Sequence, residues 1–189
     1  MLFGLLVFAL IVVVVFWFVA TYNRLVAAAE SATRAWNDLD ALLRQRHDEI
    51  PKVIEICEPH LKQERALFDR LLEARAAVFA ARQARDADAL NRAESSLRAA
   101  ATQVVIERAA EVPELAASRA FALLRQRHAT IDLELAERRD RYNAAVRDYN
   151  AVIGRLPGRL VALLAEFPLL RPLDFESRPA DEQGAPSRT

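Results

Sequence analysis

The sequence contains only one cysteine and four glycines, and these shortages limit the chemistry that the chain can carry. A single thiol, Cys57, permits no intramolecular disulfide. Four glycines leave little material for a phosphate-binding loop, and neither a nucleophile elbow nor a Cys-x-x-Cys motif is present. The 26 basic and 26 acidic side chains are interleaved along the chain, so the basic surface of a nucleic-acid binder is missing. We therefore expect no nucleic-acid partner, no cofactor and no catalytic activity.

Alanine, leucine, arginine and glutamate are abundant, and all four favour helices. Two long stretches carry apolar side chains at alternating steps of three and four residues, the spacing of one helix face. The first runs from Tyr22 to Cys57 and the second from Phe121 to Val152. Two long apolar faces need each other, and further helices, to be removed from water.

Residues 1–22 form the longest apolar run, without a charge or a proline. About 20 helical residues match the ~30 Å hydrocarbon core of a bilayer, which predicts a transmembrane anchor. A cleaved signal peptide fits less well, because no basic region precedes the run and Phe18 spoils a small-residue cleavage site before Thr21. Arg24 and Arg34 follow the anchor against Glu30, which slightly favours a cytoplasmic body.

The fold class predicted is all-α, with an N-terminal transmembrane helix followed by a long antiparallel four-helix bundle over residues 23–153. The first helix is expected to pass through Pro51 with a kink and to reach Pro59, which either separates two helices or kinks one. Three further helices are predicted at residues 61–85, 91–111 and 114–153. Asp86 or Asp88 is expected to cap the N-terminus of the helix at 91–111.

Residues 154–176 are apolar but interrupted by Pro168 and Pro172, and they are too short to span a bilayer. We expect this segment to pack against the end of the bundle, with contact to lipid as the alternative. Residues 177–189 are polar and contain proline and glycine, which predicts a disordered tail.

Several charged residues fall on or beside the apolar helix faces, where a charge must be paired or must reach water. They are Asp38, Asp40, Arg46, Arg75 and Arg139. One interpretation is that they form ion pairs between helices and set the register of the bundle. The other is that, together with Trp36, they line a polar groove that recognises a partner.

The three histidines offer weak candidates for a metal site. His60 with Glu64, and His128 with Asp132, are each spaced to project from one helix face. A di-metal bundle site would need Glu-x-x-His motifs on two helices, and no glutamate lies three residues before His47, His60 or His128. We predict no bound metal.

Five segments together resemble the LemA family. They are YNRLV at 22–26, AWNDLDALLRQRHDEIP at 35–51, the pair Ala74 and Arg75, EVPEL at 111–115, and RDRYNAAVRDYN at 139–150. The resemblance includes the apolar N-terminus and the pair Phe175 and Glu176, and it follows the chain in order. It implies a single N-terminal transmembrane helix, an N-terminus outside the cytoplasm and a long antiparallel helical bundle. It implies no enzymatic activity.

We therefore expect a non-catalytic scaffold or adaptor in the cell envelope, held in the inner membrane by residues 1–22. Its expected partners are the lipid bilayer and other membrane or envelope proteins, and a homo-oligomer is compatible with the sequence. The alternative is a sensor that binds a small ligand or a metal in the bundle interior.

Overall fold

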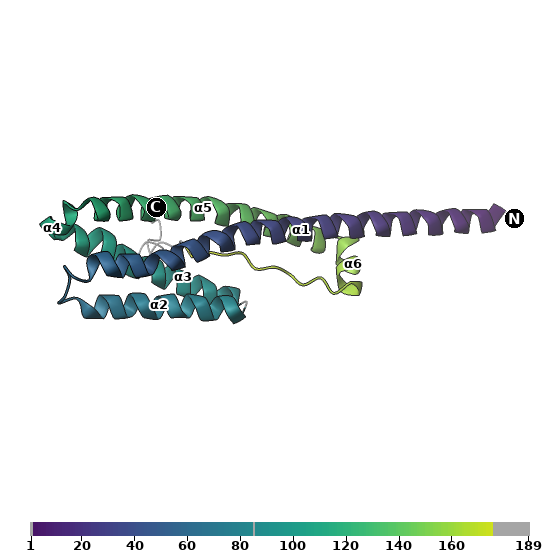
Figure 1. The fold of residues 1–189 in the computed structure, drawn as a ribbon. Helices are drawn as coiled ribbons and strands as arrows, with labels where there is room; N and C mark the ends of the chain where they lie inside the picture. Colours follow the sequence, from purple (N-terminus) through teal and green to yellow (C-terminus); the bar gives the residue numbers. More distant parts are fainter. Residues whose placement is uncertain (1, 85, 176–189) are drawn as a thin grey trace, which may run out of the picture. The chain divides into compact units, whose positions relative to one another are not determined.

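The computed structural model describes residues 2–84 and 86–175, and within these ranges all regular structure is helical (Figure 1). The α-helices are α1 (Leu2–Cys57), α2 (Arg65–Ala84), α3 (Ala87–Thr102), α4 (Pro113–Ala116), α5 (Arg119–Ile153) and α6 (Gly158–Leu164). A π-helical turn, η1 (Gln103–Arg108), and a 3-10 turn, η2 (Ala109–Glu111), follow α3. The all-α fold class and the long apolar N-terminal helix predicted from the sequence are therefore confirmed.

Helix α1 passes through Pro51 without interruption, as predicted. It ends at Cys57, and the backbone N–H groups of His60 and Leu61 both donate to the Cys57 carbonyl at 3.1 Å. Pro59 lies in this turn and has no N–H with which to continue the helix. Pro59 therefore separates two helices, which answers the question that the sequence left open.

Two predicted helix boundaries need correction. Helix α2 begins at Arg65 instead of residue 61, because Leu61 closes a turn in which its carbonyl accepts from the Glu64 N–H at 2.9 Å. Helix α3 begins at Ala87, earlier than residue 91, and it gives way after Thr102 to the π and 3-10 turns. The cap itself is as predicted, since Asp86 Oδ1 accepts from the N–H groups of residues 88 and 89 at 3.0 and 2.9 Å.

The predicted helix over 114–153 was wrong at its start, where the chain forms α4 and then α5. The Ser118 N–H donates to the carbonyl of Leu115 at 2.9 Å, which tightens the turn and ends α4. Leu115 is fully buried in this turn. The carbonyl of Ser118 then accepts from the Ala122 N–H at 3.0 Å and begins α5, which ends at Ile153 as expected.

The chain divides into two units, and α1 and α5 contribute to both. The first unit combines Met1–Asp38 with Asp140–Pro172. Its buried cluster consists of Leu25, Tyr149, Ile153, Val161 and Ala162. Further along α1, Trp36 packs edge-on against Tyr142 with ring centroids 5.6 Å apart. Higher numbers on α1 thus meet lower numbers on α5, so the two helices run antiparallel in this unit.

The second unit combines Leu39–Arg139 with Leu173–Thr189. Here α1 contacts α2 through Asp40 and Arg82, α3 through Arg46 and Glu94, and α5 through Glu49 and Arg127. The core is filled by fully buried leucines, one each from α1, α2, α3 and α5: Leu43, Leu71, Leu97 and Leu135. Helices α1, α2, α3 and α5 thus all contribute to the core of this unit.

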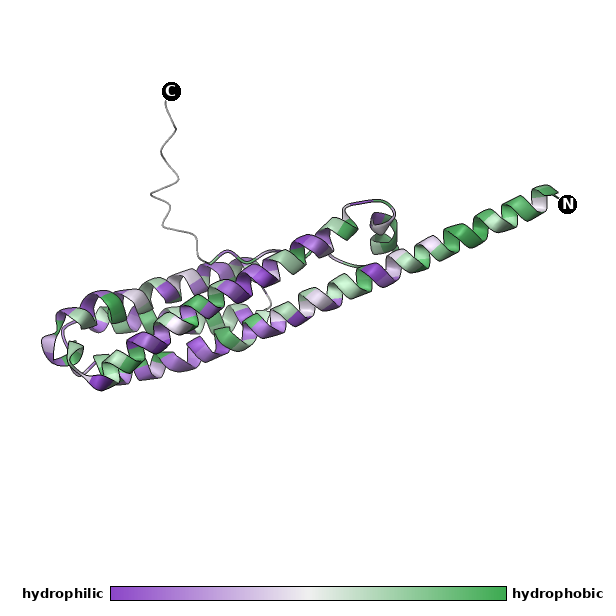
Figure 2. Ribbon diagram, turned by 90° about the horizontal axis from the view of Figure 1, so that it is seen from above, coloured by the Kyte–Doolittle hydropathy of each residue, from purple (hydrophilic) through white to green (hydrophobic). Residues whose placement is uncertain are grey.

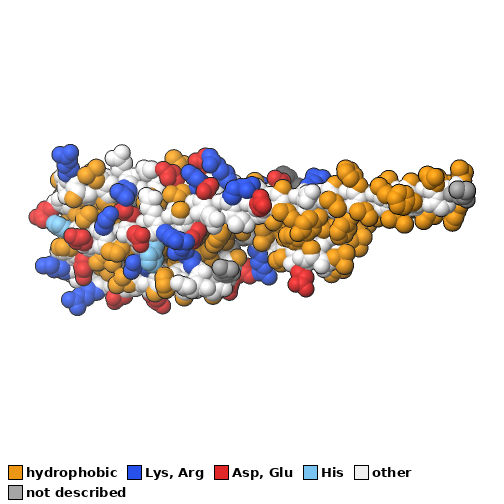
Figure 3. All heavy atoms as spheres, turned by 45° about the vertical axis from the view of Figure 1, so that its right-hand side comes forward, with side chains coloured by type: hydrophobic (Ala, Val, Ile, Leu, Met, Phe, Trp, Pro, Cys, Tyr) orange, Lys and Arg blue, Asp and Glu red, His pale blue; other side chains and the backbone are white. Residues whose placement is uncertain are grey.

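The N-terminal part of α1 is the one described helix that is long and apolar enough to cross a membrane, with a mean hydropathy of 3.1 and none of that window buried. Figure 2 shows these turns as hydrophobic nearly all round. In Figure 3 these turns are covered by hydrophobic side chains. This helix is therefore a candidate membrane span.

The segment after Ile153 packs against protein through part of its length. Val161 and Ala162 of α6 are buried in the first unit, and Leu173 and Phe175 are buried in the second. Packing was the interpretation favoured from the sequence, and it applies to these residues. The tail predicted at 177–189 lies outside the described residues.

Candidate functional site

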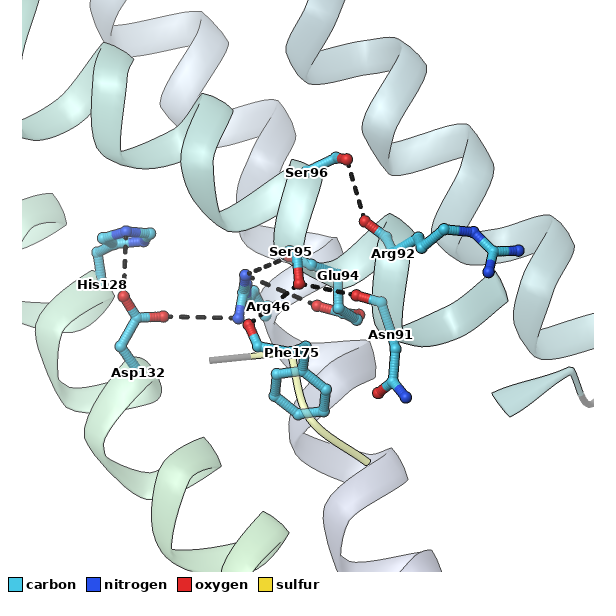
Figure 4. A network of polar contacts seen from close by, with 9 residues as sticks. All are labelled: Arg46, Asn91, Arg92, Glu94, Ser95, Ser96, His128, Asp132 and Phe175. Atoms are coloured by element: carbon cyan, nitrogen blue, oxygen red, sulfur yellow. Dashed lines mark hydrogen bonds and ion pairs between the residues drawn. The ribbon is translucent and has the colours of Figure 1, made fainter. Parts of the chain in front are cut away.

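The second unit has a charge network in its interior, drawn in Figure 4. Arg46 lies on the buried face of α1 between Leu43 and Ile50, and only 3% of it is exposed. Glu94 lies on α3 and is completely buried. Asp132 comes from α5, one residue after the buried Ile131. Three helices thus bring one cation and two carboxylates together in the core.

Arg46 is the centre of this network. Its Nη2 lies 3.6 Å from Glu94 Oε2 and donates to the Glu94 backbone carbonyl at 3.3 Å. Its Nη1 lies 3.7 Å from Asp132 Oδ1. Asp132 Oδ2 in turn lies 3.5 Å from His128 Nε2, one turn earlier on α5. The separations from the carboxylate oxygens exceed normal hydrogen-bond lengths, so the hydrogen bond that Arg46 donates goes to the Glu94 backbone carbonyl.

Burial shifts the protonation of two network members. The pKa of Glu94 is raised because the core does not solvate its charge, although the Arg46 guanidinium opposes this shift. The pKa of His128 is lowered by burial, and Asp132 opposes this shift. Both shifts favour the neutral forms of the two side chains.

A cleft of about 280 Å³ opens beside the network. Its lining includes Arg46, Arg98, Asp132, Leu135 and Phe175. Arg46 Nε, both carboxylate oxygens of Glu94 and Asp132 Oδ1 are buried and make no hydrogen bond. Buried polar atoms of this kind are costly, and they concentrate where a protein binds water or a ligand. The cleft offers donors from Arg46 and Arg98 and acceptors from the carboxylate of Asp132.

The last described residues form part of the cleft wall. The Asp174 N–H donates to Asn91 Oδ1 at 2.8 Å, and Ser95 Oγ donates to the Phe175 carbonyl at 3.3 Å. The guanidinium carbon of Arg139 lies 6.0 Å from the centroid of the Phe175 ring. These contacts hold Phe175 beside Arg46.

The network and the cleft belong to a chain whose residues 35–184 match the model of the LemA family. The chain belongs to the LemA family. No curated protein matches it. The resemblance inferred from the short segments is therefore confirmed.

A second charge cluster in this LemA family member joins α1 to α2. Asp40 Oδ1 accepts from Arg82 Nε at 2.9 Å and lies 2.7 Å from Arg82 Nη2. Asp40 Oδ2 accepts from Arg44 Nε at 2.9 Å. Asp40 is buried, so its two arginine partners offset the loss of hydration.

Arg75 has a different role in the LemA fold. Its Nε donates to the His47 carbonyl oxygen at 3.2 Å. In an uninterrupted helix that carbonyl would accept from the N–H of residue 51, but residue 51 is proline. Arg75 therefore replaces the helical hydrogen bond that Pro51 removes. This contact relates two of the segments on which the family resemblance was based.

The six residues singled out from the sequence are distributed over both units. Trp36 is half-buried and Asp38 is exposed, and both belong to the first unit. In the second unit, Asp40, Arg46 and Arg75 each make a separate contact between helices, and Arg139 lies over Phe175.

Sequence reasoning missed Glu94 of the Arg46 network and Arg82 of the Asp40 cluster. Glu94 follows Leu90 by four residues and precedes Leu97 by three, so the same stepping that identified Arg46 on α1 would have found it on α3. Arg82 offered no comparable signal, because its partner Asp40 lies 42 residues away in the chain.

Of the two histidine–carboxylate pairs considered from their spacing, the structure shows a contact for one. His128 lies near Asp132, whereas His60 Nδ1 lies 4.0 Å from Glu114 Oε2 rather than beside Glu64. Among residues 2–84 and 86–175, no three His, Cys, Asp or Glu side chains are arranged to hold a metal ion.

Proposed function

We propose that this LemA family member is a non-catalytic scaffold, anchored in the inner membrane by the first part of α1, that presents its helical second unit to other membrane or envelope proteins. The observation that supports it is the continuity of α1. One uninterrupted helix carries an exposed apolar stretch at Leu2–Val19 and, further along, the buried residues of the second unit. The anchor and the second unit thus share one helix in the sequence, with no separate linker segment between them.

The interior charges support a structural role more than a catalytic one. Asp40, Arg46 and Arg75 are each occupied by contacts that join α1 to another helix. A catalytic site needs a nucleophile or general base with access to substrate. The buried charges are instead placed to set the register of the helices, which suits a rigid binding surface.

Affinity capture tests the scaffold role. The full-length chain is captured from gently solubilised native membranes and compared by mass spectrometry with a fragment that carries residues 1–22 alone. We expect a stoichiometric membrane or envelope protein that is absent from the fragment control. Recovery of the chain alone, or only with a differently tagged copy of itself, would contradict the adaptor role.

The side of the membrane needs its own experiment, and we propose that the second unit is cytoplasmic. A cysteine introduced by Leu133→Cys lies at an exposed position of that unit. In intact cells we expect a membrane-impermeant maleimide to leave it unlabelled, and lysis to allow labelling. If the cysteine is labelled in cells in which the outer membrane alone has been permeabilised, the second unit lies outside the cytoplasm.

A small-ligand sensor is the second candidate function, and the cleft beside Arg46 favours it. Its arginine donors and carboxylate acceptors fit a small zwitterion or a carboxylate. Glycine and succinate are suitable probes, with the thermal midpoint of the full-length protein as the readout. We expect Arg98→Gln to abolish any rise in midpoint, whereas Arg44→Gln, outside the cleft, leaves it unchanged. No rise with either probe would exclude both ligand classes.

A further inference from the structure

Helix α6 is apolar on two opposite faces, but only one face is covered by protein. Gly158, Val161 and Ala162 share the covered face and are buried. Leu160, Leu163 and Leu164 recur at the i, i+3, i+4 spacing on the other face, and all three are exposed. A helix that is apolar all round normally has an apolar environment on every side.

Two further exposed leucines flank α6 in the chain. Leu156 precedes α6 and Leu169 follows it, and both are more than two-thirds exposed. We call Leu156, Leu160, Leu163, Leu164 and Leu169 the α6 leucine surface. In Figure 3, hydrophobic side chains cover both the thin N-terminal part of α1 and the bulge beside it, where α6 lies in Figure 1.

The covered face of α6 packs at the point where the candidate membrane span ends. Val161 and Ala162 share a buried cluster with Leu25, and Phe167 meets the ring of Tyr22 with centroids 6.2 Å apart. Leu25 follows Ala20 by five residues, which is roughly 7 Å along a helix. The interfacial layer of a bilayer is roughly 5 to 8 Å thick on each side of the hydrocarbon core. A span that ends at Ala20 would place helix α6 at the depth of the interface.

The charges around α6 suit the same environment. Arg155 and Arg159 are exposed beside the leucine surface, and Glu166 is the one acidic residue between positions 155 and 167. Arginines extend their apolar stems along a membrane surface and place the charged group among phosphates. Tyr22 lies where aromatic side chains gather in membrane proteins.

We propose that the α6 leucine surface inserts into the lipid interface, as a second membrane contact beside the α1 span. The proposal rests on the membrane anchoring in the proposed function. A span alone leaves the protein free to rotate about the axis of α1 and to tilt. A second contact at the side of α1 removes much of that freedom, because tilting or lifting α6 would return its leucines to water.

Fluorescence quenching by lipid tests the proposal on the full-length chain. Three variants each carry one new cysteine: Leu163→Cys on α6, Leu10→Cys in the span, and Leu133→Cys in the second unit. These leucines are 77%, 63% and 75% exposed, so replacing them removes little packing. Cys57 is fully buried and burial raises the pKa of its thiol to about 11, so it does not compete for a maleimide fluorophore in the folded protein.

Each labelled variant is reconstituted into vesicles of phosphatidylcholine and phosphatidylglycerol in equal parts, with and without bromine on the phosphatidylcholine chains. We expect brominated lipid to quench the probes at positions 163 and 10 and to leave the probe at 133 unchanged. Quenching at 10 without quenching at 163 would overturn the α6 contact while leaving the anchor. A blue-shifted but unquenched probe at 163 would also overturn it, and would indicate a second protein copy as the occupant.

Absence of quenching at both 10 and 163 would overturn the anchoring and the α6 contact together. Far-UV circular dichroism of each labelled variant must match the unlabelled protein. Arg159→Gln provides the headgroup control. We expect it to weaken quenching at 163 more in the mixed vesicles than in pure phosphatidylcholine, because the mixed vesicles carry anionic headgroups.

Discussion

Arg75 Nε donates a hydrogen bond to the carbonyl oxygen of His47, the same carbonyl whose helical partner Pro51 removes. Helix α1 thereby keeps its path through a proline, because α2 supplies the missing donor. Hydrogen bonds to charged donors contribute about 1.5–3 kcal/mol when buried, and this one is half-buried. The contact also fixes which turn of α2 lies beside Pro51.

The Pro51 relationship can be tested by a double-mutant cycle. We predict that Arg75→Ala lowers the free energy of unfolding by about 1–2 kcal/mol in the native sequence. In a Pro51→Ala background the His47 carbonyl regains a backbone donor, so the same Arg75 substitution should cost clearly less. Chemical unfolding of the detergent-solubilised chain, followed by circular dichroism, measures both. Equal costs in the two backgrounds would show that Arg75 does not compensate for the proline.

Removal of Arg46 should be more damaging than removal of an exposed arginine. Arg46→Ala leaves Glu94 and Asp132 without their shared cation, and breaking a buried pair costs about 3–5 kcal/mol. Arg44→Ala is the matched control, because its side chain is 65% exposed and such pairs contribute about 1 kcal/mol or less. Arg46→Met combined with Glu94→Leu should recover part of the loss. Equal unfolding midpoints for the two alanine variants would contradict the buried network.

The dependence of stability on pH should carry two opposite contributions from the network. The pKa of His128 is lowered from 6.5 by burial. As the pH falls below 6.5, His128 is therefore protonated in the unfolded chain before it is protonated in the folded chain. This contribution to stability is present above pH 6.5 and is lost as pH falls through the folded pKa. The pKa of Glu94 is raised from 4.5, so its contribution is present below pH 4.5 and is lost as pH rises through the folded pKa.

Two neutral substitutions separate these contributions. His128→Asn should reduce the loss of stability that occurs as the pH falls below 6.5. Glu94→Gln should reduce the loss of stability that occurs as the pH rises above 4.5. Unfolding free energies measured at several pH values for the wild type and both variants provide the comparison. If the three curves stay parallel, the two side chains do not titrate differently in the folded and unfolded states.

Gly158 should not tolerate a side chain. A Cβ at this position would lie 2.0 Å from the carbonyl oxygen of Val152, so the chain could not return from α5 to α6 as it does. We predict that Gly158→Ala lowers the free energy of unfolding by about 1–3 kcal/mol. Gly4→Ala is the control, because a Cβ at Gly4 meets no atom within 4 Å. Thermal unfolding of the two variants should differ accordingly, and equal midpoints would contradict this close approach.

Glu166 is the one non-glycine residue with positive φ in the described chain, at 55°. It follows the end of α6, where the Phe167 N–H donates to the Ala162 carbonyl at 3.0 Å, the bond of a Schellman motif. We predict that Glu166→Gly raises the free energy of unfolding by about 1 kcal/mol, because glycine adopts this conformation without strain. Glu166→Ala removes the same charge but keeps the Cβ, so a similar gain for alanine would assign the effect to charge instead.

Local patterns were sufficient wherever a feature depends on residues close in the chain. The apolar faces of α1 and α5, the cap by Asp86 and the end of α5 at Ile153 were all predicted. The break after α4 was not predicted, because residues 114–118 contain no proline or glycine, and the turn bond from the Ser118 N–H to the Leu115 carbonyl is visible only in the structure. Intrinsic helix propensity is a weak signal, and tertiary contacts override it.

Helical periodicity and hydropathy are local properties, so the amino-acid order was enough to predict an all-helical LemA family chain with an apolar N-terminal helix. The pairing of the charges depends on packing and could be read only from the folded chain. Arg46 with Glu94 and Asp40 with Arg82 join residues more than 40 positions apart, and a charge has no preference for one distant partner until packing brings them together. The same holds for α6. Its leucines are apolar in any context, and only the packing of Val161 and Ala162 beside Leu25 separates the face that meets protein from the face that we propose meets lipid.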